Sequence, residues 1–131
     1  MSQENVEIVR RGFEGFLATG EPVWELTHEH VVVADHDLMD AGEYRGHAGF
    51  TRWLADWASA WSEFTSEPAE EILDAGDDVV IVYRLKATGR ASGVTLERQD
   101  AMVCRVQDGK IVRLDYYNDR SQALKSVGLE E

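Results

Sequence analysis

Residues 98–124, RQDAMVCRVQDGKIVRLDYYNDRSQAL, say more about the fold than any other part of the chain. Two segments rich in apolar and β-branched residues flank Asp108 and Gly109, a dipeptide typical of tight hairpin turns. Asp119 follows the second segment and is a favoured helix N-cap residue, while Gly128 is a typical stop. The stretch therefore predicts a β-hairpin that leads into a short closing helix.

One acidic residue lies on an otherwise apolar strand face of this hairpin. Asp100 alternates with Met102 and Val106, so a period of two places its carboxyl group on their face. An acid in apolar surroundings is costly to bury and is typical of functional sites. The alternative is a carboxylate at the strand edge, paired with Arg84 or Arg98.

The second strand of the hairpin has one face that is more apolar than the other. We expect that face to point toward the interior, and it carries Val112, Leu114, Tyr116 and Asn118. Arg113 and Asp115 would then lie on the opposite face of the sheet.

Upstream of the hairpin the hydrophobic pattern changes from a helical to a strand period. Helices are expected over residues 2–20, from Pro22 onward, and over 46–61, where the apolar stripe comprises Phe50, Trp53, Leu54, Trp57 and Trp61. Strands are expected over residues 31–34, 64–73, 79–88, 94–106 and 111–117, with an acidic loop over 35–43. Pro68 within a strand indicates a sheet edge or a bulge.

Composition excludes several functional classes. The chain of 131 residues carries a formal net charge of -12, which disfavours binding to nucleic acid or to an anionic membrane. No segment approaches the ~20 apolar residues of a membrane span, and residues 1–5 lack the pattern of a signal peptide. The single cysteine, Cys104, suits a reducing compartment. We expect one cytoplasmic domain over residues 1–131.

Helices followed by four long strands in hairpin order indicate an α+β fold. We expect a curved antiparallel sheet with helices packed over its concave face. Such a sheet is cone-shaped and encloses a hollow, which is the natural place for a ligand.

The order and spacing of several short motifs resemble those of a known family. These motifs are Tyr44-Arg45-Gly46-His47 before the Trp-rich helix, Asp74-Ala75-Gly76-Asp77 before a Val-rich strand, Ser92-Gly93-Val94, Asp108-Gly109-Lys110-Ile111, and Tyr117-Asn118-Asp119-Arg120. With the first helix ending at Gly20, they resemble the SnoaL-like polyketide cyclase branch of the nuclear transport factor 2-like (NTF2-like) superfamily, which is related to ketosteroid isomerase. The resemblance implies the cystatin-like α+β barrel, and it does not specify a reaction.

The resemblance also implies a set of catalytic residues. In the isomerase relatives a general base follows a short early strand, a position that matches His36 or Asp37 here. Asp100 lies near the position of a protonated acid that donates a hydrogen bond to an oxyanion, a carboxylic acid that apolar surroundings keep neutral. The tyrosine that completes this oxyanion site in the isomerases has no counterpart, because the matching position is Phe13. Steroid isomerisation is therefore not expected.

Further residues are expected to line the ligand site. They are Phe13, Trp24, Trp57, Met102, Tyr116 and Asn118. No cofactor fingerprint or phosphate loop is present in the sequence, and we expect no cofactor. His28 and His30 are more simply explained as surface residues than as ligands of a metal, so we expect no metal.

Two functions remain open from the sequence. One is a cofactor-free cyclase or isomerase that acts by acid/base chemistry on a small apolar or polyketide-like carbonyl compound. The other is a noncatalytic ligand-binding protein or dimeric scaffold with the same pocket. For either function the resemblance implies a homodimer formed through the convex face of the sheet.

Overall fold

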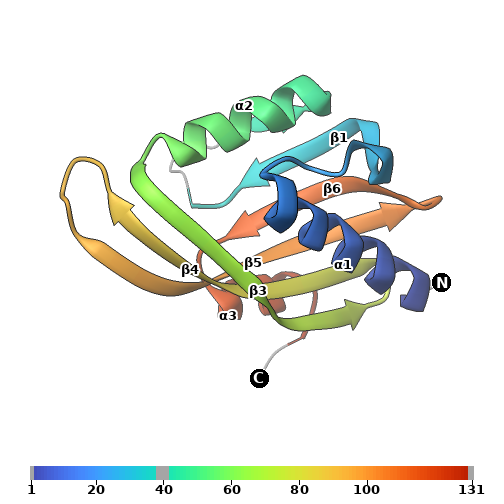
Figure 1. Cartoon of the computed structure of the whole chain (residues 1–131). Helices are drawn as coiled ribbons and strands as arrows, with labels where there is room; N and C mark the ends of the chain where they lie inside the picture. Colours follow the sequence, from blue (N-terminus) through green and yellow to red (C-terminus); the bar gives the residue numbers. More distant parts are fainter. Residues whose placement is uncertain (1, 38–41, 130–131) are drawn as a thin grey trace.

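The computed structural model describes residues 2–37 and 42–129. The elements follow in the order α1 (Ser2–Thr19), the 3-10 helix η1 (Trp24–Leu26), β1 (Thr27–Asp35), β2 (Glu43–Arg45), α2 (Gly46–Ala58), β3 (Trp61–Ala75), β4 (Asp78–Gly89), β5 (Thr95–Gln107), β6 (Lys110–Tyr117) and α3 (Arg120–Ser126) (Figure 1). Part of the predicted acidic loop, residues 38–41, lies outside the described residues. Within the described ranges, no helix has both the length and the apolar character needed to cross a bilayer.

All the strands belong to one curved, mixed sheet with the order β2-β1-β6-β5-β4-β3. The last four strands form consecutive antiparallel hairpins, as the sequence predicts. The hairpin turn between β5 and β6 places Asp108 and Gly109 at positive φ, 51° and 79°, which explains this dipeptide at that position. The strand β1 pairs in parallel with β6, a pairing that hairpin order alone does not predict.

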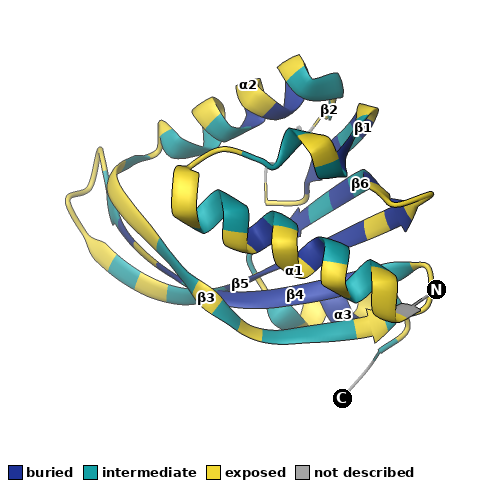
Figure 2. Cartoon of the chain, turned by 45° about the vertical axis from the view of Figure 1, so that its right-hand side comes forward, coloured by how far each residue is buried: buried dark blue, intermediate teal, exposed yellow. Residues whose placement is uncertain are grey.

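Both faces of the sheet are covered, but by different helices. The helices α1 and α2 pack on one face and form the main core with it (Figures 1 and 2). The helix α3 packs on the opposite face, where Ala123 and Leu124 contact a second apolar cluster that includes Val80 and Val82. The sequence predicts all helices on the concave face, and α3 departs from that. Because both of its faces are covered, β4 is apolar at consecutive positions rather than at alternate ones.

Two predicted boundaries differ from the structure. The strand β1 begins at Thr27, before the predicted apolar run, and the helix α2 ends at Ala58. Trp61 therefore opens β3 rather than extending the aromatic stripe of α2. Pro68 lies in the edge strand β3 beside a register shift, as predicted.

An irregularity in β6 reverses one predicted orientation. Arg105 pairs with Arg113, whereas Val106 pairs with Ile111, so β6 holds an extra residue at this point. The resulting bulge turns Ile111 into the main core in place of Val112. Beyond the bulge the predicted alternation holds, since Leu114 and Tyr116 are both in that core.

Candidate functional site

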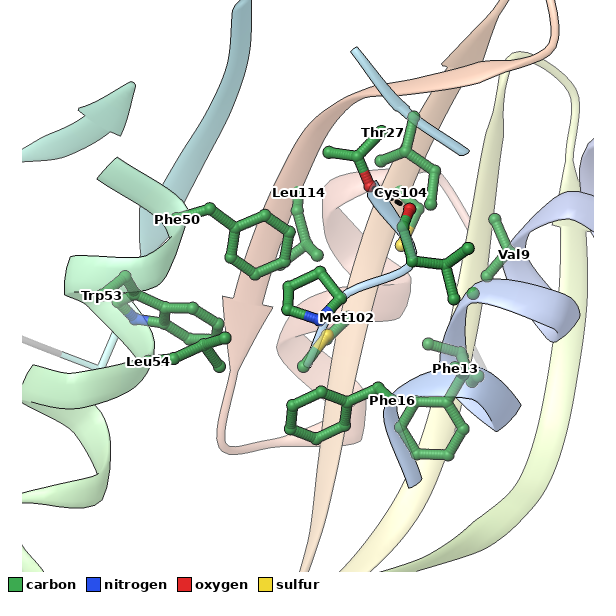
Figure 3. A pocket seen from close by; sticks show the side chains of 15 residues that line it. Val9, Phe13, Phe16, Thr27, Phe50, Trp53, Leu54, Met102, Cys104 and Leu114 are labelled. Carbon is green, nitrogen blue, oxygen red and sulfur yellow. Dashed lines mark hydrogen bonds between the residues drawn. The ribbon is translucent and has the colours of Figure 1, made fainter. Parts of the chain in front are cut away.

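The face of the sheet beneath α1 and α2 encloses an inner chamber with apolar walls. Its cavity volume is about 70 Å³. Side chains of α2, including Phe50 and Trp53, face Phe13 and Phe16 of α1 across it (Figure 3). The remaining wall residues are Val9, Gly12, Pro22, Val23, Thr27, Leu54, Ile81, Met102, Cys104, Ile111 and Leu114. These walls suit an apolar part of a ligand and offer almost no polar contact.

An outer chamber of about 230 Å³ adjoins the inner one. Phe16, Trp53, Leu54 and Met102 line both chambers, which we together call the hollow. On one side of the outer chamber Trp57 and Phe64 stand edge to face, with ring centroids 4.9 Å apart. The wall of the outer chamber includes the hydroxyl-bearing residues Ser66, Tyr83 and Tyr116, whereas the inner chamber has only Thr27, whose hydroxyl donates to the Val23 carbonyl at 2.9 Å.

A line of polar residues crosses four adjacent strands on the face that forms the floor of the hollow. Tyr83 of β4 pairs with Asp100 of β5, Met102 pairs with Tyr116 of β6, and Tyr116 pairs with Asp35 of β1. We call Tyr83, Asp100, Tyr116 and Asp35 the polar row. All four residues are buried among the apolar side chains of this face. Buried polar groups of this kind need hydrogen-bond partners or a function.

Asp100 forms the centre of a hydrogen-bonded network. The register places it inward, so the prediction of a carboxyl group on the apolar face is confirmed. Arg98 Nε donates to Asp100 Oδ1 at 2.7 Å, and the Tyr116 hydroxyl donates to Asp100 Oδ2 at 2.5 Å. A second nitrogen of Arg98 donates to the Tyr116 oxygen at 2.9 Å. The ion pair with Arg98, which the sequence left as an alternative, is therefore present together with the inward orientation.

Burial and charge shift the pKa values of this network. Burial raises the pKa of Asp100, and the hydrogen bonds from Tyr116 and Arg98 oppose that rise. Burial also raises the pKa of Tyr116 well above its usual value, and the nearby carboxylate of Asp100 adds to this effect. Burial would lower the pKa of Arg98, but Tyr116 and Asp100 outweigh it and the pKa is raised. The phenol of Tyr116 thus remains a hydrogen-bond donor at neutral pH.

Asp35 is a buried acid at the end of β1, although the sequence predicts it at the start of an acidic loop. It is 2% exposed, and the indole Nε1 of Trp53 donates to its Oδ2 at 2.7 Å. Its Oδ1 accepts the backbone N–H of Asp37 at 2.9 Å. The signal was available, because Asp35 continues the alternation of the fully buried residues Val31 and Val33. Its contacts attach α2 to the sheet beside the outer chamber.

Tyr83 was likewise not singled out from the sequence. It is 3% exposed, lines the outer chamber, and packs its ring against Phe13 with centroids 4.8 Å apart. Burial raises its pKa well above the usual value, and the proximity of Tyr116 and Asp100 adds to the rise. A tyrosine within a β-branched strand is indistinguishable from ordinary core packing in the sequence.

His36 lies on the opposite face of the sheet from the hollow. Because Asp35 points inward, the alternation of β1 turns His36 outward. Its Nε2 lies 2.8 Å from Oδ1 of Asp115, and its ring stacks on Tyr117 with centroids 4.4 Å apart. The structure therefore does not bring His36 together with Asp100.

Asp37 and Asn118 follow Asp35 and Tyr116 of the polar row by two positions, and neither is among the wall residues of the two chambers. The side-chain amide of Asn118 donates a hydrogen bond to Asp37 Oδ1. Burial is the main cause of the raised pKa of Asp100, and the negative charge of Asp37 adds a smaller contribution to it. Of the two positions predicted for a base, Asp37 is the one on the side of this network.

The other predicted ligand-binding residues fall into two groups. Phe13, Met102, Trp57 and Tyr116 line the hollow. Trp24 instead packs against His47, with ring centroids 4.6 Å apart, and against Phe50 behind the chamber wall.

The described residues offer no cluster of three or more His, Cys, Asp or Glu side chains that could hold a metal ion. The polar groups near the hollow are phenols, carboxyls, an amide and a guanidinium. Such a set can bind and polarise a carbonyl oxygen and can move a proton.

Comparison with known proteins identifies the relatives of this chain. A family model described as "SnoaL-like domain" matches residues 9–114. A search of curated proteins gave no significant match.

Solved structures share the fold along almost the whole chain. TerC, co-crystallised with polyporic acid, has 20% identity and a TM-score of 0.72, covering 95% of this chain and 98% of TerC. A putative SnoaL-like polyketide cyclase from Jannaschia sp. CCS1 has 19% identity and a TM-score of 0.72, covering 100% and 96% of the two chains. A hypothetical protein from Catenulispora acidiphila DSM 44928 with a ketosteroid isomerase-like fold, in complex with trimethylamine, has 18% identity, a TM-score of 0.68 and coverage of 94% and 93%.

These similarities confirm the predicted α+β fold of the NTF2-like and ketosteroid isomerase-like proteins. At these identities they establish the fold, and the reaction must be argued from the site.

Proposed function

Since the chain belongs to the SnoaL-like domain family, we propose that it binds a small, largely apolar carbonyl compound in the hollow and catalyses its cyclisation or isomerisation without a cofactor. One observation carries the proposal: the outer chamber of an apolar hollow is lined by the phenols of Tyr83 and Tyr116, and the buried carboxyl of Asp100 is hydrogen-bonded to Tyr116 directly behind them. Apolar walls with a few convergent polar groups are typical of small-molecule sites. The structural relatives co-crystallised with polyporic acid and with trimethylamine support ligand binding by this fold.

The proposed chemistry begins with enolisation. Asp37 takes a proton from the carbon next to the ligand carbonyl, and the electron pair moves to the carbonyl oxygen. The Tyr116 hydroxyl, which donates to Asp100 in the free protein, turns its proton to the developing oxyanion, while Arg98 still donates to the Tyr116 oxygen. Asp100 and Arg98 act as positioning residues, because they hold the Tyr116 oxygen from two sides at 2.5 and 2.9 Å. The enolate then attacks an electrophilic carbon of the same molecule or is reprotonated at a different carbon.

Hydrogen exchange in D₂O tests this step directly. Acetophenone and 2-acetylnaphthalene each have a methyl group next to the carbonyl, and proton NMR records its loss of signal. We expect the protein to accelerate the exchange, and we expect Asp37→Asn and Tyr116→Phe to reduce that acceleration about 100-fold. His36→Asn is the matched control on the opposite face of the sheet and should leave the rate unchanged. Loss of the rate in the control, with retention in Asp37→Asn, would refute the assignment.

A noncatalytic binding function is the second candidate, and one observation favours it. The hydrogen-bonding groups of Asp100, Arg98 and Tyr116 already pair with one another, which is also how a purely structural network would look. Quenching of the fluorescence of Trp53 and Trp57, which line the hollow, reports binding independently of turnover. Saturable quenching without any hydrogen exchange would select this second function.

The proposal includes a homodimer formed through the sheet face opposite the hollow. On that face α3 covers β4 and β5, and the neighbouring surface carries the stacked pair His36 and Tyr117 beside Asp115. Sedimentation equilibrium tests it: the protein should sediment as a dimer, and Tyr117→Arg should convert it to monomer. A wild-type monomer at micromolar concentration would exclude the dimer without touching the proposal for the hollow.

A further inference from the structure

The Tyr83 hydroxyl is a polar group of the hollow that lacks a role in the network described so far. Tyr83 is 3% exposed and lines the outer chamber. Among the described residues, none forms a hydrogen bond with this hydroxyl. The hydroxyl is not among the fully buried side-chain atoms without a partner, so a ligand in the outer chamber can reach it. A buried hydroxyl without a partner costs free energy, and a ligand that supplies the partner recovers it.

The neighbouring polar groups are already paired with one another in the free protein. Both oxygens of Asp100 already accept hydrogen bonds, from Arg98 and from Tyr116. The Tyr116 hydroxyl accepts a hydrogen bond from Arg98 and donates one to Asp100. Tyr83 is the direct strand partner of Asp100, so its hydroxyl lies at the edge of this satisfied network and faces the chamber.

The charge around Tyr83 selects the kind of acceptor. The guanidinium of Arg98 is paired with the carboxylate of Asp100 at 2.7 Å, so their charges largely cancel. Asp37 adds a further negative charge near the network. A carboxylate on the ligand would be repelled by this negative charge, and no unpaired positive charge of the network would compensate for the repulsion. A neutral carbonyl oxygen needs only a hydrogen-bond donor, which the Tyr83 hydroxyl supplies. The site therefore favours a ketone over a carboxylate.

The arrangement of the two chambers gives the ligand a direction. A rigid ligand that places its carbonyl at Tyr83 can extend its apolar part past Phe16, Trp53 and Met102 into the inner chamber. We propose that Tyr83 determines ligand specificity by donating a hydrogen bond to the carbonyl oxygen of a neutral aryl or alicyclic ketone whose apolar part lies in the outer chamber and reaches into the inner one. This inference rests on the proposed function and names the class of compound that the hollow takes.

Matched ligands test the inference by titration calorimetry. 2-Acetylnaphthalene carries the carbonyl, 2-ethylnaphthalene has nearly the same shape without it, and 2-naphthoate replaces the ketone with a carboxylate. The wild-type protein should bind the ketone about fivefold more tightly than the hydrocarbon, the value of one net hydrogen bond. It should bind the naphthoate about tenfold more weakly than the ketone. Tyr83→Phe should bind ketone and hydrocarbon equally.

A spectroscopic measurement separates this role from a structural one. The ring of Tyr83→Phe can keep its contact with Phe13, so the variant should fold with wild-type stability. The infrared carbonyl band of bound ¹³C-labelled 2-acetylnaphthalene should lie at higher frequency in Tyr83→Phe than in the wild type, because a hydrogen bond is lost. Tyr117→Phe, on the opposite face, is the control and should change neither the band nor the affinity ratio.

The outcomes separate the inference from the proposed function. If Tyr83→Phe retains the full preference for the ketone, or if its carbonyl band is unchanged, the inference is overturned while binding in the hollow stands. A wild-type preference for the naphthoate overturns it as well. If the wild-type protein binds none of the three compounds, the proposed function fails and the inference fails with it.

Discussion

Removal of the Arg98 guanidinium is the sharpest test of the network beneath the hollow. In Arg98→Met the carboxylate of Asp100, which is 0% exposed, loses its countercharge and keeps only the hydrogen bond from Tyr116. Breaking a buried ion pair by removing one partner costs about 3–5 kcal/mol. Because the side chain of Arg98 is 24% exposed, water screens part of the interaction, and we expect the free energy of unfolding to fall by about 3 kcal/mol.

Urea denaturation followed by tryptophan fluorescence measures this loss. The matched control is Arg84→Met, which breaks an ion pair with Glu70 that is 3.6 Å long and has side chains 42% and 39% exposed. An exposed pair of this kind contributes little, so the control should change stability by no more than about 0.5 kcal/mol. A loss below about 1 kcal/mol in Arg98→Met, or a loss equal to that of the control, would refute the reasoning.

The pH dependence provides a second check with a definite sign. Burial raises the pKa of Asp100 in the folded state, so the folded protein binds this proton more tightly than the unfolded chain does. The contribution of Asp100 to the free energy of unfolding is therefore greatest at low pH and is lost as the pH rises through the folded pKa. Arg98 lowers this pKa, so its removal raises the pKa of Asp100 further. The stability deficit of Arg98→Met relative to the wild type should therefore shrink as pH falls from 7 toward about 4. A deficit that stays constant over this range contradicts an unpaired carboxylate as its cause.

Three further substitutions test other parts of the structure. Trp53→Phe leaves Oδ2 of buried Asp35 without its 2.7 Å donor and should cost about 2 kcal/mol in urea denaturation; no loss would show that this hydrogen bond does not attach α2 to the sheet. Asp119→Ala removes the N-cap of α3 and should cost about 1 kcal/mol, whereas Asp119→Asn should retain most of the stability. Gly15→Ala places a Cβ 2.3 Å from Cγ2 of Val23 and should push the Val23 side chain into the inner chamber. We expect the free energy of unfolding to fall by about 1–3 kcal/mol and the calorimetric affinity for 2-acetylnaphthalene to weaken. Unchanged affinity would show that the ligand does not occupy the chamber.

The fold was accessible from the sequence because local signals repeat along it. Asp108 and Gly109 define the last hairpin by requiring positive φ, and the N-cap at Asp119 locates α3. The face on which α3 packs was not accessible, since β4 is apolar on both of its sides and gives no indication of which helix covers which side. The parallel pairing of β1 with β6 is also a long-range event with no local signature.

The candidate site was predicted unevenly for reasons of strand alternation. Asp100 could be placed inward because its strand alternates regularly from Met102 onward. Asp35 could have been placed inward by the same rule applied to Val31 and Val33, which would also have turned His36 outward. The inward orientation of Ile111 in place of Val112 could not be predicted, because a bulge depends on how two strands pair and not on the sequence of one strand.

The network of Arg98, Asp100 and Tyr116 is better explained by function than by stability. Replacing a buried ion pair with apolar residues of similar volume is often neutral or stabilising. The double variant Arg98→Met/Asp100→Leu should therefore be more stable than Arg98→Met alone and close to the wild type. In that variant the Tyr116 hydroxyl loses the two groups that hold it at 2.5 and 2.9 Å and keeps only its hydrogen bond with Trp57. Stable folding with loss of the methyl hydrogen exchange would assign the network to the positioning of Tyr116, whereas retained exchange would show that Tyr116 needs no support.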